Sequence, residues 1–180
     1  EVKNPIDKMA LEAMTQYKDF FKNNYSTIIK IFYGQMVSRI FVDNMVKSSS
    51  YTPICFFSLP IPGESRMLSL NRISIIDCFE EFTMPEHLRG DNQWKDDETN
   101  EKYDAVKKID IWDFPSILIV CLKRFDNYGR KRNDLVTFPV ENLDLTKFCI
   151  GYNKYKSYFD LMGVCNHSGG AGFGHYYSYC

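Results

Sequence analysis

The sequence contains no apolar run of the roughly 18 residues that a membrane-spanning helix needs. Its first residues lack the basic and then apolar pattern of a secretory signal. The 22 lysines and arginines are balanced by 23 aspartates and glutamates, so no excess of positive charge points to nucleic acid. We therefore expect no membrane association, no nucleic-acid partner, and a cytoplasmic or nuclear location.

The cysteines do not form any C-x-x-C pair, which argues against a local metal or redox motif. Several lie among apolar neighbours, where a free cysteine behaves as a small buried hydrophobe. Without a secretory signal we expect reduced thiols, and a disulfide framework is the weaker alternative. The six cysteines are Cys55, Cys78, Cys121, Cys149, Cys165 and Cys180.

The chain has 180 residues, of which 44% are hydrophobic, and this is enough for one domain with a sizeable core. Aromatic residues make up 16% of the sequence, and such residues favour β-structure. The order of the expected elements does not alternate strand and helix, which argues against a doubly wound parallel sheet. These features predict an α+β fold with a mainly antiparallel sheet.

Hydrophobic periodicity predicts a helix over residues 7–22, capped by Asp7. The sequence Ser74-Ile75-Ile76-Asp77 resembles a capping box, which predicts a second, short helix at about 74–82. A strand–turn–strand unit is predicted over residues 27–42, with its turn at Gly34-Gln35. Further strands are expected at 54–59, 116–125, 135–140, 158–166 and 174–180, a mobile loop tip at 48–50, and an exposed acidic loop at 91–101.

The most informative segment is residues 158–180, in which seven residues separate His167 from His175, and four of the seven are glycine. Glycine adopts backbone angles that other residues avoid and lets another chain approach closely. A glycine-rich loop that ends on a histidine can therefore form one wall of a narrow slot. Such a slot admits only a thin, extended substrate.

This segment resembles the histidine box of the ubiquitin-specific proteases, which reads N-H-x-G, a glycine-rich loop and then G-H-Y-x-x-Y. Four further motifs lie upstream of it in the order in which the family has them, and an ordered set is stronger evidence than any single motif. The resemblance covers roughly residues 10–180. The further motifs are residues 31–35 (F-x-G-Q), residues 57–62 (L-x-L-P-I-P), residues 78–90 (C-L-x-x-F-x-x-x-E-x-L-x-G), and residues 105–115 followed by Leu122-Lys123-Arg124-Phe125.

The resemblance implies a papain-like cysteine protease fold shaped like a hand. Residues 1–26 would end a helical thumb region, 27–102 would form the fingers and 103–180 the palm. The implied activity is that of a deubiquitinase, a thiol protease that cleaves the peptide or isopeptide bond after the last glycine of ubiquitin. The implied partners are ubiquitin and ubiquitinated proteins, and no cofactor is implied.

Site residues are implied by the same resemblance. His175 would be the general base that deprotonates a catalytic cysteine, and His167 would lie near the bound ubiquitin tail, with a purely structural role as its alternative. Residues 168–174 correspond to a blocking loop over that tail. The expected substrate-binding residues are His167, Gly169, Gly170, Gly172, Gly174 and Tyr176.

The sequence departs from the family in lacking an N-G-N-T-C-type box, and no Asp or Asn follows His175 to orient it. We therefore expect a fragment with one member of a catalytic triad, inactive by itself. The alternatives are a catalytically inactive ubiquitin-binding module and an unrelated β-domain with chance matches. Cys165 and Cys180 are weak nucleophile candidates, since alternation along a strand places Cys180 and His175 on opposite faces. Buried structural thiols are the preferred interpretation.

Many family members bind zinc at the fingertip through two C-x-x-C pairs. The matching positions here are Val42 with Met45 and Asp96 with Thr99, so we expect no metal and fingers held by packing alone.

Cations gather around a predicted hairpin turn, at Lys123, Arg124, Arg130, Lys131 and Arg132. They either belong to a second loop beside the tail channel or lie on a solvated turn, and for residues 130–132 we expect the solvated turn. His87 is expected to have no functional role.

Overall fold

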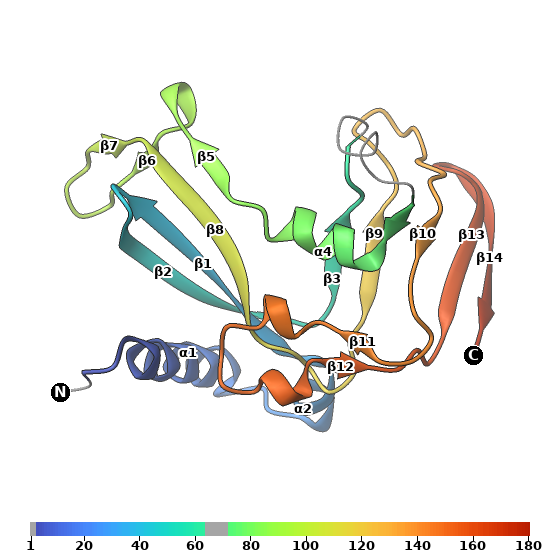
Figure 1. Ribbon diagram of the computed structural model, residues 1–180, viewed down its shortest axis with the longest axis horizontal. Coiled ribbons are helices and arrows are strands. Elements are labelled where there is room, and N and C mark those ends of the chain that lie inside the picture. Colours follow the sequence, from blue (N-terminus) through green and yellow to red (C-terminus); the bar gives the residue numbers. More distant parts are fainter. Residues whose placement is uncertain (1–2, 64–71) are drawn as a thin grey trace.

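The computed structural model describes residues 3–63 and 72–180, and it shows two groups of strands separated along the long axis of the molecule (Figure 1). The first group is a four-stranded antiparallel sheet. The second group contains short strand pairs and the C-terminal hairpin, and helix α4 lies between the two groups. In spatial order the large sheet contains β2 (Met45–Ile54), β1 (Gly34–Val42), β8 (Ala105–Asp113) and β5 (Glu86–Leu88).

Helix α1 (Pro5–Phe21) confirms the predicted N-terminal helix but begins two residues earlier. Its cap is Asn4, whose Oδ1 accepts a hydrogen bond from the Ile6 backbone N–H at 3.2 Å, so Asp7 lies inside the helix rather than at its cap. The helix packs on the large sheet through buried Ala13. Gln35 donates from Nε2 to the Ala13 carbonyl at 2.9 Å and fixes the helix against the start of β1.

The prediction of a strand over residues 27–33 is wrong, because Thr27–Phe32 form a short helix, α2. A short apolar run does not distinguish a strand from a helical segment by periodicity alone. The deciding group is the Ser26 hydroxyl, which accepts from the Ile29 backbone N–H and so caps a helix. Gly34-Gln35 is therefore the start of β1 and not a turn.

The hairpin between β1 and β2 turns at Asp43-Asn44, and both residues have positive φ, 51° and 63°. These values fit a two-residue type I′ turn, which matches the twist of the flanking strands. Consequently the polar residues 48–50 lie within β2, and the expected loop tip there is wrong. Polar residues occur in this strand because much of it is exposed.

The main core lies beneath α4 (Ile75–Phe82) and the parallel pair β3 (Phe57–Pro60) and β9 (Val120–Lys123). The capping box is confirmed, since the Ser74 hydroxyl accepts from the Asp77 backbone N–H at 3.3 Å and Asp77 accepts from the Ser74 N–H at 2.7 Å. The buried core residues are Phe57, Leu59, Ile61, Ile73, Ile75, Cys78, Phe79, Ile111, Phe114, Val136, Leu145, Phe148 and Cys149.

A second parallel pair, β4 (Ile73–Ser74) with β10 (Val136–Thr137), departs from the antiparallel pattern expected for the strands. The expected strands at 116–125, 135–140 and 158–166 are shorter or divided, because backbone pairing covers only part of each apolar run. The segment 91–101 is mostly exposed but contains β6. The remaining elements are η1 (Gly90–Asn92), β6 (Trp94–Lys95), β7 (Lys102–Tyr103), β11 (Leu143–Asp144), η2 (Thr146–Phe148), η3 (Lys154–Lys156) and β12 (Tyr158–Phe159).

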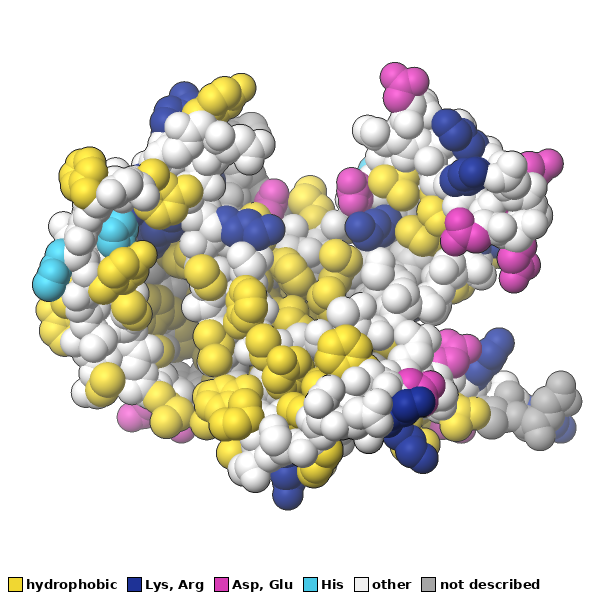
Figure 2. All heavy atoms as spheres, turned by 180° about the vertical axis from the view of Figure 1, so that it is seen from behind, with side chains coloured by type: hydrophobic (Ala, Val, Ile, Leu, Met, Phe, Trp, Pro, Cys, Tyr) yellow, Lys and Arg dark blue, Asp and Glu magenta, His cyan; other side chains and the backbone are white. Residues whose placement is uncertain are grey.

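None of the helices described in residues 3–63 and 72–180 is both long and apolar enough to span a bilayer. Seen from behind, two lobes rise on either side of an open gap (Figure 2).

Candidate functional site

The glycine-rich segment forms the end of a hairpin between β13 (Val164–Gly170) and β14 (Phe173–Tyr179). Only residues 171 and 172 lie outside the strands, so the loop expected over 168–174 is mostly paired backbone. Gly169 has φ +124°, and a Cβ there would lie 2.5 Å from the Phe173 carbonyl oxygen. Glycine is therefore required at this position by both backbone angle and space.

The two histidines lie on opposite faces of this hairpin. His167 is paired with Tyr176, and His175 is paired with Ser168. Because successive side chains of a strand point to opposite faces, the His175 imidazole lies on the face away from the His167 ring. His175 is exposed, and among the residues that the structure describes none hydrogen-bonds its ring.

The His167 ring is held by three neighbours. Its Nδ1 lies 3.1 Å from Nζ of Lys131, and the Tyr176 ring lies 4.6 Å away between centroids. An ammonium only donates, so Nδ1 accepts and the proton of the neutral imidazole is on Nε2. Gly174 lies against the ring, and a Cβ at that position would overlap Nε2. The absence of a side chain at 174 therefore makes the space that the imidazole fills.

The segment between β9 and β10 forms a loop that reaches the glycine-rich hairpin (Figure 1). Its ends meet in a backbone bridge between Phe125 and Lys131. Inside it, the Asp126 carboxylate accepts from the backbone N–H groups of Tyr128 and Arg130 at 2.9 Å each. The backbone N–H of Arg130 is the main cause that lowers the pKa of Asp126. These bonds give the loop a defined shape.

The expectation of a solvated turn at residues 130–132 holds for Arg130, whose side chain is 77% exposed and pairs with Asp126. It is wrong for the next two cations. Lys131 donates to the carbonyl groups of His167 and Gly169 at 2.6 Å and 3.2 Å, and Arg132 donates to the Ile61 carbonyl at 2.8 Å. These acceptors come from segments distant in sequence, which no local charge pattern reveals.

Two of the cysteines are buried, Cys55 is half-buried and three are exposed, and none of the six lies in a disulfide. Burial raises the pKa of Cys78 to about 11, which makes it a poor nucleophile. Cys165 and Cys180 are exposed, contrary to the expectation of buried thiols, because β13 and β14 pair only with each other among the described strands. Cys165 is paired with Ser178 and shares the His167 face, so it does not face His175.

The fingertip positions that match zinc ligands in the family are occupied by residues in other roles. Val42 is buried beside the turn, Met45 is 60% exposed, and the Asp96 carboxylate accepts from the Glu98 backbone N–H at 2.9 Å. Within residues 3–63 and 72–180 no group of three or more His, Cys, Asp or Glu side chains could hold a metal ion. His87 lies exposed on β5.

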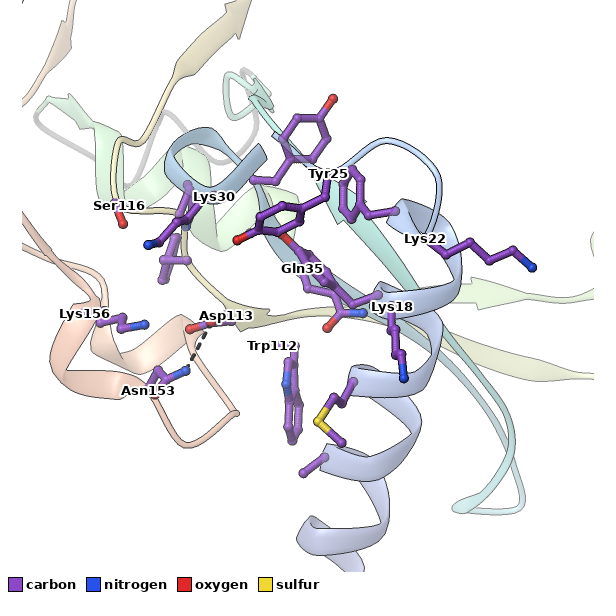
Figure 3. Close-up of a pocket in the computed structure, with 18 residues that line it drawn as sticks. Lys18, Lys22, Tyr25, Lys30, Gln35, Trp112, Asp113, Ser116, Asn153 and Lys156 are labelled. Carbon is purple, nitrogen blue, oxygen red and sulfur yellow. Dashed lines mark hydrogen bonds between the residues drawn. The ribbon is translucent and has the colours of Figure 1, made fainter. Parts of the chain in front are cut away.

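A groove of about 740 Å³, the α1 groove, lies away from this hairpin between α1, β1 and the end of β8 (Figure 3). Asp113 at its edge accepts from Nδ2 of Asn153 at 3.2 Å, and burial raises the pKa of Asp113. Lys18 and Lys22 point away from Asp113. No sequence pattern predicts this groove, because its walls come from separate parts of the chain.

The family model described as ubiquitin carboxyl-terminal hydrolase matches residues 6–180. Since the match spans nearly every residue, this chain belongs to the ubiquitin carboxyl-terminal hydrolase family. Ubiquitin carboxyl-terminal hydrolase 4 of Saccharomyces cerevisiae is 37% identical over 141 residues, covering 78% of this chain and 15% of that protein. Human ubiquitin carboxyl-terminal hydrolase 15 is 40% identical over 108 residues, covering 58% of this chain and 11% of that protein. The chain therefore spans a small part of the curated relatives it matches.

Solved structures share the fold. A yeast SAGA DUB module superposes with a TM-score of 0.69 at 24% identity, covering 93% of this chain and 37% of that chain. The SAGA Ubp8/Sgf11/Sus1/Sgf73 DUB module bound to ubiquitin aldehyde gives a TM-score of 0.68 at 23% identity, covering 97% of this chain and 40% of that chain. The predicted α+β fold of the ubiquitin-specific protease type is thereby confirmed.

Proposed function

We propose that this chain is part of the catalytic domain of a deubiquitinase and that His175 is its general base. Family membership supports the proposal, and the observation that carries it is the placement of His175. Its exposed imidazole lies on β14, three residues beyond a tight glycine-rich turn. A base in this position is open to a thiol on one side and to an extended substrate along the hairpin tip.

The reaction would be acyl transfer by nucleophilic catalysis. The imidazole of His175 takes the proton of a cysteine thiol, and the thiolate attacks the carbonyl carbon of the last glycine of ubiquitin. The imidazolium then gives its proton to the departing amine, and water hydrolyses the thioester. Backbone or side-chain donors would stabilise the oxyanion.

The 180 residues contain no Cys box, and Cys165, the cysteine within the hairpin strands, lies on the face opposite His175. We therefore propose that the isolated chain does not hydrolyse ubiquitin conjugates. The nucleophile and the group that orients His175 would have to come from other residues of the complete enzyme.

The tip of the hairpin would form one wall of the channel for the ubiquitin tail. Glycines at 169, 170, 172 and 174 let an extended backbone approach without side-chain interference. Tyr176 is 68% exposed beside them, and its ring packs on His167. Because Lys131 fixes the His167 ring, this histidine would act as a rigid part of that wall.

The body of ubiquitin would lie in the gap between the two lobes (Figure 2). A structural neighbour with the same fold is bound to ubiquitin aldehyde, which supports ubiquitin as the partner. On this proposal, residues 27–102 form the fingers and 103–180 form the palm, while residues 1–26 end the thumb region.

The test is His175→Ala in the complete enzyme that contains this chain, with a ubiquitin–fluorophore amide as substrate. Loss of a general base lowers turnover by about a hundredfold to ten-thousandfold. His87→Ala is the matched control, since His87 is an exposed histidine on β5, and it should leave turnover unchanged. Near-normal turnover of His175→Ala would refute the assignment, and cleavage by the purified 180-residue chain would refute its inactivity.

A second candidate function is ubiquitin binding without catalysis, favoured by the lack of a Cys box among these 180 residues. The residues encoded upstream of Glu1 discriminate the two, since a Cys box there favours the enzyme. Titration of the 180-residue chain with ubiquitin tests binding directly. No saturable signal at high micromolar ubiquitin would exclude the chain as an independent binder.

A further inference from the structure

Lys131 lies where the loop of residues 125–131 meets the glycine-rich hairpin. Its ammonium has three N–H donors, and three acceptors on β13 surround it. These are the His167 carbonyl at 2.6 Å, the Gly169 carbonyl at 3.2 Å and Nδ1 of His167 at 3.1 Å. The Phe125 ring lies on another side, with its centroid 6.0 Å from Nζ. One side chain thus joins two loops that are more than 30 residues apart in sequence.

The carbonyl groups that Lys131 binds flank Ser168, and Ser168 is the register partner of His175. The backbone carbonyl groups of a strand alternate between its two edges. Residues two apart therefore direct their carbonyl groups to the same edge, and the residue between them directs its carbonyl group to the other edge. Lys131 therefore holds the outer edge of β13, while the backbone of Ser168 is directed toward β14 and His175. The lysine acts on the position of His175 through the strand, without touching its ring.

The hairpin needs such a tie, because an isolated two-stranded hairpin is only marginally stable in water. Every residue of β14 is exposed, and no described residue hydrogen-bonds the His175 ring. The two loops also approach each other at Gly129, where an added Cβ would lie 3.6 Å from the Ala171 Cβ. The backbone of the hairpin is therefore what places His175.

We propose that Lys131 is a positioning residue for His175, holding β13 and β14 in register through the carbonyl groups of His167 and Gly169. This inference rests on the proposed function, in which His175 is the general base. Removal of the ammonium leaves the outer carbonyl groups of β13 exposed to water. The His175 imidazole then loses its fixed distance to the reacting thiol.

The first experiment uses Lys131→Met in the complete deubiquitinase that contains this chain, because methionine keeps an apolar stem but has no donor. We expect kcat to fall about tenfold or more, the pattern of a group that acts in the transition state, with a smaller rise in KM because the released His167 ring belongs to the proposed channel wall. Lys131→Arg retains donors for the two carbonyl groups and should restore kcat to within about threefold of wild type. Arg130→Met is the control, since that side chain is 77% exposed and binds Asp126 in the same loop.

The second experiment measures amide hydrogen exchange in the 180-residue chain. Lys131→Met should speed exchange across β13 and β14 and leave α4 unchanged, which also shows that the variant is folded. A rise in KM with unchanged kcat and unchanged exchange would overturn the inference, because Lys131 would then be a contact for ubiquitin. Wild-type rates and wild-type exchange in Lys131→Met would overturn it as well.

The two experiments separate this inference from the function on which it rests. If the wild-type enzyme does not cleave the ubiquitin amide, the proposed function fails, and a role for Lys131 in catalysis fails with it. If the wild-type enzyme is active and Lys131→Met is equally active, only the inference about Lys131 fails.

Discussion

Alanine in place of Gly174 should open the tip of the glycine-rich hairpin. The added Cβ would overlap Nε2 of His167 and would lie 2.5 Å from the Ser168 carbonyl oxygen. Rotation of the imidazole can relieve the first contact but not the second, because the carbonyl belongs to the paired strand. The hairpin must therefore widen at the residue next to His175.

The cost has two parts. Overpacking of a close-packed site costs about 1–3 kcal/mol. Displacement of the imidazole weakens its bond to the Lys131 ammonium, and a hydrogen bond to a charged group contributes about 1.5–3 kcal/mol. We expect the free energy of local opening to fall by about 2–4 kcal/mol, since the two effects share one displacement. The loss should be confined to the hairpin, because the core beneath α4 does not contact Gly174.

Amide hydrogen exchange resolved by residue is the assay, with Gly172→Ala as the matched variant. A Cβ at Gly172 meets no atom within 4 Å, so this substitution should leave protection of β13 and β14 unchanged. Wild-type protection of the hairpin in Gly174→Ala would refute the argument, because the close approach of His167 and Ser168 would then have no energetic consequence. Equal loss of protection in Gly174→Ala and Gly172→Ala would also refute the argument, because the loss would then not depend on the close contacts at Gly174.

Three further predictions concern other parts of the chain. Asp110→Ala removes a nearly buried carboxylate that pairs with Arg39 at 2.5 Å and should destabilise the fold by about 3 kcal/mol in urea unfolding. Lys107→Met, which breaks the exposed pair with Glu86, should cost about 0.5 kcal/mol or less, and similar losses in the two variants would contradict this reasoning. Iodoacetamide at pH 8 should label Cys165 and Cys180 rapidly and Cys78 only after unfolding, because Cys78 is buried with its pKa raised to about 11. Mass spectrometry of the labelled peptides measures the labelling of each cysteine. Burial raises the pKa of Asp113, so the folded state binds the carboxyl proton more tightly than the unfolded state does. The resulting contribution to stability is present below the unfolded pKa of roughly 3.9. It is lost as pH rises through the folded pKa. Asp113→Asn should therefore raise Tm at pH 7 and change it little at pH 3, and a lower Tm at pH 7 would show that the charged form is favoured.

Local chemistry made several features predictable. The capping box at Ser74 and Asp77 fixes the start of α4 through groups three residues apart, so the sequence alone reveals it. The glycine pattern before His175 requires close backbone approach, and the structure has that approach at Gly169 and Gly174.

Other features were not predictable, either because two local patterns compete or because the feature depends on distant contacts. The segment from Thr27 to Phe32 is apolar enough for either a strand or a helix, and a serine cap decides in favour of the helix. The turn at Asp43-Asn44 was not predicted, because the polar residues of β2 resemble a loop and suggested a turn there instead. Lys131 resembles any cation in a turn until the fold brings β13 beside it, 36 residues later in sequence. The boundaries of thumb, fingers and palm stay a prediction.

The position of Lys131 also affects how this hairpin would meet another polypeptide. An unpaired strand edge offers a row of N–H and C=O groups to which a foreign strand can add, and lysine is a common residue that prevents such addition. Lys131 occupies this edge on β13, where its ammonium takes the carbonyl groups of His167 and Gly169. The outer edge of β14 pairs with no other described strand, and its residues Phe173–Tyr179 carry no lysine, arginine, proline or carboxylate. Self-association of the purified chain should therefore proceed through β14, and a charged residue on that edge should suppress it.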